Sequence, residues 1–328
     1  MKFNYGGQAV LEGVMMRGQR HMAVAGRAPN GEIILKTEPL QSKIYTSKLW
    51  RLPFMRGLVS LWDALVLGTQ TLFFSANVAM LDPDAPQGSE QNVDTEQISG
   101  WALWSTMAFS LLFAIGLFFA APPFIATLAF SWTDQHIAVN IAEGVIRLAI
   151  FMGYLWLMGK MPDVRRVFMY HGAEHKTINA YEADAKLEPE TVQTFTTVHT
   201  RCGTSFLLVV LVVASVIFVF MGDLSFIWKL VSRIFIIPLV ATGAYEFLRF
   251  TAANYRFRVV RWLAAPGLAL QKMTTRQPEL PMLEIAIVAL EHVLAADGII
   301  SQEEYEARRL RLPVRPAQPV RGNSGAAA

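Results

Sequence analysis

The segment between residues 160 and 203 concentrates the side chains that bind transition metals most readily. It holds three of the six histidines, His171, His175 and His199, and the sole cysteine, Cys202. His171 and His175 are one helical turn apart, so on a helix their imidazoles share a face and can bind one ion. Imidazole together with thiolate favours zinc or another borderline metal over calcium or magnesium. The segment therefore predicts a divalent transition-metal site, with zinc as the most suitable ion.

The first two histidines flank a glutamate in the order His171-x-x-Glu174-His175. This order matches the inverted zincin arrangement, in which two histidines hold zinc and the intervening glutamate is the general base that activates water. A helix can begin after Pro162, and nothing before Glu182 stops it except a tolerable glycine. The sequence therefore predicts a helix that carries two metal ligands and Glu174 as a catalytic base.

Four further residues are candidate ligands. Glu182 follows His175 by two helical turns and so shares its face. His199 and Cys202 end the same loop, where Cys202 is either a ligand or a small buried residue that turns the chain into the next apolar stretch. Glu246, near the end of the last apolar stretch, could reach the loop as a ligand or base. In the alternative interpretation, the histidines only cap and hydrogen-bond a polar surface loop.

Three other polar residues are further candidates: one belongs to the loop itself, and two could contact it from the N-terminal segment. Arg201 directly precedes the cysteine, and Glu12 and Arg17 belong to the glycine-rich segment 6–18. That segment lacks the Lys-Ser/Thr pair of a phosphate-binding loop and does not follow a strand. No nucleotide site or other cofactor-binding motif is predicted there.

The elements that must position these residues are unusually apolar. The chain of 328 residues is 53% hydrophobic and 17% charged, whereas soluble domains carry about 25% charged residues. We therefore expect an integral membrane protein, mainly α-helical, with about four transmembrane helices in residues 101–250. Glu143 and Arg147, one turn apart in the second stretch, are predicted to form a structural pair. The four apolar stretches are Trp101 to Trp132, Ile141 to Gly159, Thr204 to Met221 and Ile227 to Phe250.

Lysine and arginine indicate the orientation, because basic residues near span ends stay on the cytoplasmic side. Nine precede the first apolar stretch, six lie in residues 160–201 and eleven follow Leu248, against only Lys229 and Arg233 around the last short turn. The pattern predicts a multi-pass protein of the cell inner membrane, with both termini and the loop 160–203 in the cytoplasm. No basic stripe is interleaved with stacking aromatics, so membrane lipids rather than nucleic acid are the expected partners.

Smaller elements flank the apolar region. Residues 1–53 are predicted to form a cytoplasmic cap with a β-hairpin, because two short strand candidates flank Asn30-Gly31. The remaining segments are predicted as an interfacial helix at 54–80, a linker at 81–100, a cytoplasmic helical segment at 251–311 that ends in a hairpin around Asp297-Gly298, and a disordered tail at 312–328.

Five strings of the sequence are long and specific: Gly7 to Arg17, Pro53 to Gly57, Tyr170 to Glu182, His199 to Phe206 and Tyr245-Glu246. Through them, and over nearly its full length, the sequence resembles the YqhQ-like family of uncharacterised bacterial membrane proteins. The family usually has proline where Thr200 stands, a departure that removes no ligand. Because the family is described only as predicted metal-dependent enzymes, the resemblance implies a membrane location and a metal site at the matching His and Glu positions, without a reaction.

We therefore expect a membrane-embedded metal-dependent enzyme, most readily a zinc hydrolase, that acts on an unknown protein or lipid substrate. One alternative is a non-catalytic protein that binds or transports a metal ion, which would use the same ligands but need a polar path through the helices. A second alternative is a scaffold whose loop and cap recruit a partner at the membrane. The metal content of purified protein separates these hypotheses, while the sequence gives no indication of the oligomeric state.

Overall fold

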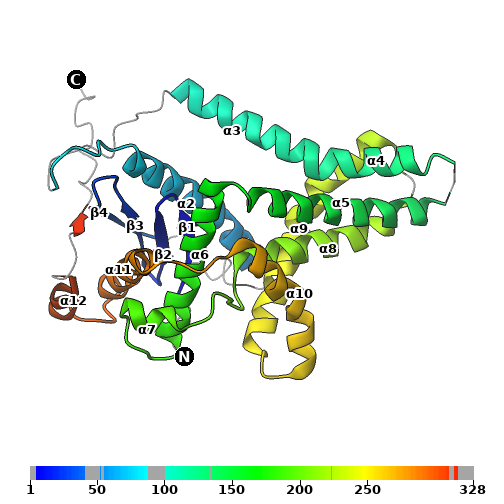
Figure 1. The fold of residues 1–328 in the computed structure, drawn as a ribbon. Coiled ribbons are helices and arrows are strands. Elements are labelled where there is room, and N and C mark those ends of the chain that lie inside the picture. Colours follow the sequence, from blue (N-terminus) through cyan, green and yellow to red (C-terminus); the bar gives the residue numbers. More distant parts are fainter. Residues whose placement is uncertain are drawn as a thin grey trace, which may run out of the picture.

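The computed structural model describes residues 5–40, 52, 55–87, 100–132, 135–222, 224–309 and 314–316. Figure 1 shows a small sheet with helices packed on it and, extending away from it, a group of long apolar helices. The sequence predicted both parts in outline, a β-containing cap and a mainly helical remainder. Most of the predicted linker and most of the predicted tail lie outside the described residues.

The sheet is an antiparallel meander with one added parallel strand, in the order β1-β2-β3-β4-β5. The predicted hairpin is confirmed, since β3 and β4 pair on either side of the turn that contains Gly31, whose φ is +86°. The tail was predicted to be disordered from residue 312. This is wrong for residues 314–316, which form a strand that pairs with β4. The strands are β1 (Gly6–Val10), β2 (Gly13–Arg17), β3 (His21–Arg27), β4 (Ile33–Pro39) and β5 (Val314–Pro316).

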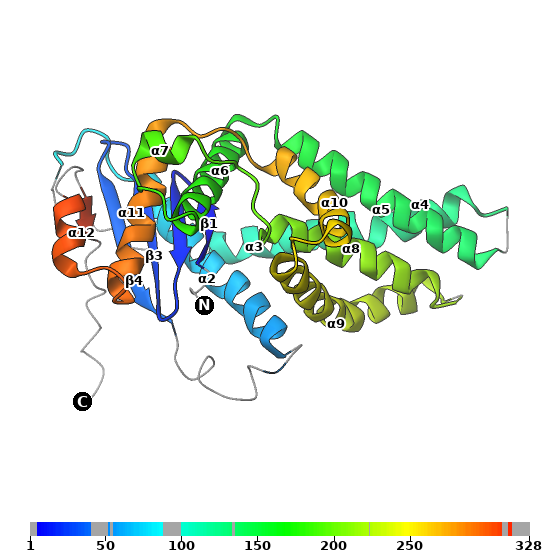
Figure 2. The same cartoon turned by 90° about the horizontal axis from the view of Figure 1, so that it is seen from below.

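Both faces of the sheet are covered by helices, because its strands alternate between two apolar cores. Helices α6 (Pro162–Glu182) and α11 (Leu280–Ala296) cover one face, and α2 (Met55–Ala79) covers the other, as Figure 2 shows. The strand residues facing α6 and α11 include Val14, Met16, Ala23, Ala25, Ile33 and Leu35. Those facing α2 include Met15, Met22, Val24 and Ile34.

The apolar helices extend to one side of the sheet in both views (Figures 1 and 2). Among the described residues, three are long and apolar enough to cross a membrane: Trp104–Ala129, His136–Met158 and Ile227–Ala253. The third predicted stretch forms a shorter apolar helix of 17 residues, α8 (Gly203–Val219). Large side chains on these helices are exposed, for example Phe109 at 71% and Leu128 at 69%. Such a continuous apolar surface is typical of contact with lipid.

The first candidate span consists of α3 (Gly100–Ile115), the π-helical segment η2 (Gly116–Ala120) and α4 (Ala121–Ala129). Pro122 and Pro123 lie in the first turn of α4 and have no N–H, so the carbonyls of Phe118 and Phe119 lack their usual helical donors. Side chains from two other helices replace those donors.

The replacement donors are arginines of α5 (His136–Met158) and α9 (Phe226–Ala253). Arg147 Nε donates to Phe118 O at 3.3 Å, and Arg233 Nη1 donates to Phe119 O at 2.8 Å. Both arginines also pair with Glu143 Oε1. The predicted Glu143–Arg147 pair is thus confirmed, and Arg233 extends it into a cluster, called here the arginine cluster, that joins three helices.

The remaining helices are α7 (Pro189–Gln193), α10 (Arg258–Thr274) and α12 (Gln302–Arg309). The predicted hairpin of α11 and α12 is confirmed, with Glu304 N donating to Ser301 Oγ at 3.1 Å at the start of α12. Asp297, at the end of α11, accepts hydrogen bonds from Gln19 N at 2.6 Å and Arg20 N at 3.1 Å. The N-terminal sheet and the C-terminal hairpin therefore pack as one unit.

Candidate metal centre

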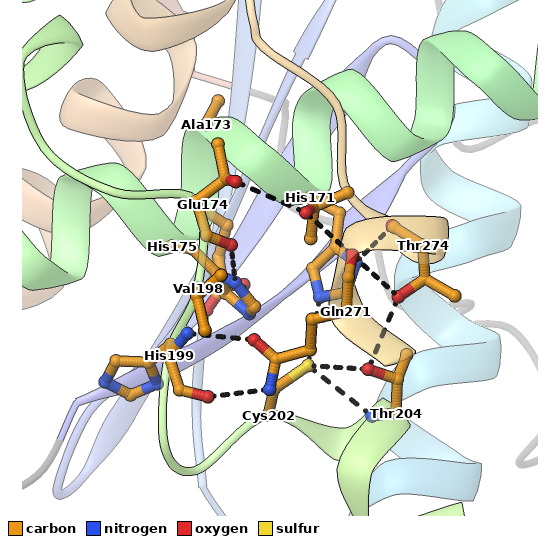
Figure 3. Close-up of polar contacts among 12 residues, drawn as sticks. His171, Ala173, Glu174, His175, Val198, His199, Cys202, Thr204, Gln271 and Thr274 are labelled. Carbon is orange, nitrogen blue, oxygen red and sulfur yellow. Dashed lines mark hydrogen bonds and ion pairs between the residues drawn. The ribbon is translucent and has the colours of Figure 1, made fainter. Parts of the chain in front are cut away.

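Helix α6 carries the predicted site residues, as the sequence indicated. Pro162 occupies its first turn together with Asp163, both favourable at a helix N-terminus. Tyr170, Ala173 and Ile178 on one side of the helix pack into the core against the sheet. The histidines project toward α10 and the chain that leads into α8 (Figure 3).

His171, His175 and Cys202 converge, and we call these three residues the His/Cys site. One ligand atom from each lies within 4.8 Å of the others. Cys202 Sγ is 3.3 Å from His171 Nε2, and the two imidazole centroids are 4.4 Å apart. Cys202 and His175 are buried, and Cys202 is the N-cap residue of α8. The structure thus brings the two histidines of α6 together with Cys202, about thirty residues further along the chain.

Both imidazoles are oriented by backbone carbonyls. His171 Nδ1 lies 2.9 Å from Thr274 O, and His175 Nδ1 lies 2.6 Å from Thr197 O. A carbonyl can only accept, so each Nδ1 carries a proton, and in the neutral ring the lone pair is then on Nε2. Metal-binding histidines characteristically donate their second ring N–H in this way. Two Nε2 atoms and one thiol sulfur form a donor set that fits Zn²⁺, which takes three protein ligands in catalytic sites.

The carbonyl that orients His171 is held by a close backbone approach. Arg276 N donates to Phe168 O at 2.8 Å, which draws residues 274–276 across α6. A Cβ atom on Gly172 would lie 2.0 Å from Arg276 O, so only glycine permits this approach. The sequence marked Gly172 merely as tolerable in a helix, whereas its position between the two histidines was the signal that mattered.

The carbonyl that orients His175 is held by two further side chains of α6. Lys176 is buried and donates to Gln193 O at 2.6 Å, while burial lowers the pKa of its ammonium group. Asn179 donates to Val198 O at 3.1 Å and to Thr196 O at 2.9 Å. These contacts fasten residues 193–198 along the helix, and sequence reasoning assigned them no role.

A third positioning residue comes from α10. The side chain of Gln271 is fully buried, accepts from His199 N at 2.9 Å and donates to His199 O at 2.8 Å. It also donates to Ser205 Oγ at 2.9 Å. A fully buried amide whose groups are paired fixes the chain on either side of Cys202. Its only sequence signal is a polar residue in an amphipathic helix, which did not single it out.

Glu174 lies beside the His/Cys site but outside it. Its carboxylate is buried, with Oε2 3.5 Å from His175 Nε2. Strand β1 passes directly over it, since a Cβ on Gly7 would lie 2.8 Å from Glu174 Cγ. The carboxylate is therefore held close to a potential ligand atom, where the sequence placed a general base.

Glu182, His199 and Arg201 form a second polar group next to the site. Glu182 pairs with Arg201, and its Oε2 lies 3.6 Å from His199 Nε2, beyond hydrogen-bonding distance but close enough for attraction to a protonated ring. Burial opposes ionisation of Glu182, but His199 and Arg201 outweigh it and keep the pKa of Glu182 below its usual value. The centroid of His199 is 5.6 Å from that of His175. These residues border the three-ligand group without belonging to it.

The remaining candidates lie elsewhere. Glu246 forms a two-pronged ion pair with Arg56, whose Nε donates to Oε1 at 2.6 Å, so it joins α9 to α2 rather than contributing to the His/Cys site. Glu12 does contact α6, accepting two hydrogen bonds of 2.6 Å from Arg166 and one of 3.2 Å from Tyr170. Arg17 lies half-buried on β2.

Comparison with known proteins identifies relatives but no activity. The family model described as "Protein of unknown function (DUF1385)" matches residues 52–296. The "Uncharacterized protein YqhQ" of Bacillus subtilis (strain 168) is 32% identical over 307 residues, which cover 92% of this chain and 95% of that protein. No solved structure matches significantly. The matched residues of the family model include the entire His/Cys site.

Proposed function

The chain belongs to the YqhQ-like family of proteins of unknown function (DUF1385), and from this premise we propose that it is a membrane-embedded metal-dependent enzyme, most readily a hydrolase. Its ligands are His171, His175 and Cys202. The observation that carries the proposal is the convergence of His171, His175 and Cys202, supported by the Nδ1 to carbonyl hydrogen bonds that hold both imidazoles in place. Histidines that served only to fasten a polar loop could make the same carbonyl hydrogen bonds, but they would not need to converge with the cysteine.

The chemistry divides between the ion and the protein. A Zn²⁺ ion held by this donor set would supply Lewis acidity. Glu174 is buried beside His175 and can hold the proton taken from water, the role that its place between the two histidines predicts. Arg201, partly exposed and paired with Glu182, can receive a negatively charged part of a substrate at the edge of the site.

The membrane arrangement belongs to the same proposal. α8 would make the fourth span, because its 17 helical residues cover about 25 Å at about 1.5 Å each, close to the hydrocarbon core of about 30 Å. Four spans place both termini and the His/Cys site in the cytoplasm, in agreement with the distribution of lysine and arginine. The inner membrane of a bacterium is the expected location.

Metal analysis tests the proposal. Protein purified in detergent without chelator is expected to carry about one equivalent of zinc, and the double variant His171→Ala with His175→Ala is expected to carry none. His136→Ala, an exposed histidine at the start of α5, is the matched control and should keep the metal. Native protein without metal, together with a double variant as stable as the parent, would show that the site does not exist.

A second variant tests the role of Glu174. Glu174→Gln is expected to keep the metal, because the carboxylate lies outside the three-ligand group, and to lose activity in an assay of metal-dependent hydrolysis. Loss of the metal from this variant would make Glu174 a ligand and contradict the inverted zincin assignment.

A further inference from the structure

A pocket of about 290 Å³ opens where α5 ends and α6 begins. It is distinct from the His/Cys site, although both use the chain that follows α10. Three of its lining residues are cationic and none is acidic. The lining residues are Leu155, Trp156, Gly159, Lys160, Arg165, Met273 and Arg276.

The three cations have no carboxylate partner among the described residues. Within the described part of the chain, Lys160, Arg165 and Arg276 form no ion pair with a carboxylate. Lys160 Nζ lies 5.0 Å from the ring centroid of Trp156, and Arg276 Nη1 donates to Lys272 O at 2.7 Å. Three positive charges around one concavity create a potential that attracts an anion. The N-terminal end of α6, a helix of 21 residues, adds its positive dipole beside Arg165.

The position of the pocket indicates which anion it meets. α5 is a candidate span that ends at Met158, so the pocket lies at the level of lipid head groups if α5 crosses the membrane. Trp156 is 61% exposed at this end, where tryptophan is typical of a membrane interface. Leu155 and Met273 give the pocket an apolar part next to its cationic part. A phospholipid has the same two parts side by side, a charged phosphate and an apolar diacylglycerol.

We propose that this pocket binds the phosphate group of an anionic phospholipid of the cytoplasmic leaflet. The site requires no metal, but it rests on the membrane arrangement proposed above. Guanidinium and ammonium groups from three separate segments surround the phosphate, while the apolar side chains contact the glycerol and the first acyl carbons.

Lipid titration tests the inference. Purified full-length protein in detergent is titrated with phosphatidylglycerol, and the bound lipid is counted by native mass spectrometry. The double variant Lys160→Gln with Arg165→Gln is expected to bind this lipid roughly tenfold or more weakly, because two of the three cations are lost. Both side chains are exposed, so the variant should fold. The matched control is Arg261→Gln, an exposed arginine of α10 outside the pocket, which should bind like the parent.

Two comparisons identify the ligand. Phosphatidylcholine, which carries no net charge, is expected to bind much more weakly, and inorganic phosphate is expected not to displace phosphatidylglycerol. Equal binding of the two lipids, or an equal loss in Arg261→Gln, would overturn the inference in favour of a non-specific surface. Displacement by inorganic phosphate would show a site for a soluble anion. The His171→Ala, His175→Ala variant should bind lipid like the parent, so failure of the metal proposal leaves this inference intact.

Discussion

The arginine cluster and the His/Cys site are both buried and polar, yet their atoms are used differently. In the arginine cluster, the donors of Arg147 meet Phe118 O, Ser215 Oγ and Glu143, and those of Arg233 meet Phe119 O and Glu143. In the His/Cys site, a backbone carbonyl takes Nδ1 of each imidazole, whereas Nε2 of His171 faces Cys202 Sγ at 3.3 Å and Nε2 of His175 faces Glu174 Oε2 at 3.5 Å, and all three of His171, His175 and Cys202 can offer a ligand atom to one ion.

This difference separates a structural role from a binding role. Groups whose hydrogen-bonding capacity is taken up by the protein stabilise the packing of the elements that carry them. Ligand atoms that converge, on imidazole rings whose other nitrogen is held by a hydrogen bond, can bind an ion. A buried polar cluster is therefore informative about function only once the partner of each atom is known.

Removing the shared carboxylate of the arginine cluster has the largest expected effect. Glu143→Leu leaves two buried arginines without their common partner, which should lower the free energy of unfolding by about 3 kcal/mol or more. Unfolding in detergent, followed by circular dichroism, measures the change. Metal content in the fraction that stays folded should equal that of the parent, because the cluster contains no ligand.

The control for this prediction is Glu143→Gln, which retains an acceptor oxygen and should be destabilised less. A Glu143→Leu protein within about 0.5 kcal/mol of the parent would mean that the arginines do not depend on Glu143. Loss of metal from folded Glu143→Leu would mean that the two clusters are coupled, and the contrast between them would fail.

Local patterns in the sequence predicted much of this comparison. The spacing of His171 and His175 on a helix, the hairpin around Gly31 and the Glu143–Arg147 pair all depend on residues a few positions apart, and each is confirmed. Cys202 was predicted as a candidate ligand from its residue type, and the structure places it at the two histidines. Whether these residues bind a metal stays a prediction.

The parts that were not predicted depend on contacts between distant segments. The carbonyl of Thr274 lies 103 residues from His171, and backbone carbonyls have no signature in a sequence. Arg233 joins Glu143 across 90 residues, and Glu246 meets Arg56 across 190. The sequence indicated that Glu246 lies near the cytoplasmic end of its helix and could reach the loop. It did not indicate that Arg56 would pair with Glu246.

A smaller effect is expected from closing the space at Gly172. Gly172→Ala places a Cβ against Arg276 O, so residues 274–276 must move away and take Thr274 O from His171. The zinc affinity should fall by about tenfold to a hundredfold, and the free energy of unfolding by about 1–3 kcal/mol. Competition with a zinc-binding dye measures the affinity.

Gly153→Ala is the matched control, because nothing lies within 4 Å of the added Cβ on α5. It should leave zinc affinity unchanged. If Gly172→Ala binds zinc like the parent, the carbonyl of Thr274 does not orient a ligand, and the feature that distinguishes the His/Cys site from the arginine cluster loses its support.

The smallest effect on stability is expected from breaking the ion pair of Glu12 and Arg166. This pair is charged like the arginine cluster but more exposed, with side-chain exposures of 31% for Glu12 and 48% for Arg166. Hydrogen bonds from Arg166 lower the pKa of Glu12 below its ordinary value of 4.5 against the opposing effect of burial, with smaller help from Tyr170 and Arg27. A carboxyl with a lowered pKa stabilises the fold above the unfolded-state value, and this stability is lost as the pH falls through the folded-state pKa.

Glu12→Gln should therefore lower the free energy of unfolding by no more than about 1 kcal/mol at pH 7, since solvent screens the pair. The difference in the free energy of unfolding between parent and variant, called here the gap, should narrow below pH 4.5. A gap that is constant from pH 7 to about pH 3 would show that packing rather than charge determines the contribution of Glu12. A loss as large as that of Glu143→Leu would show that exposure does not separate the two ion-paired groups.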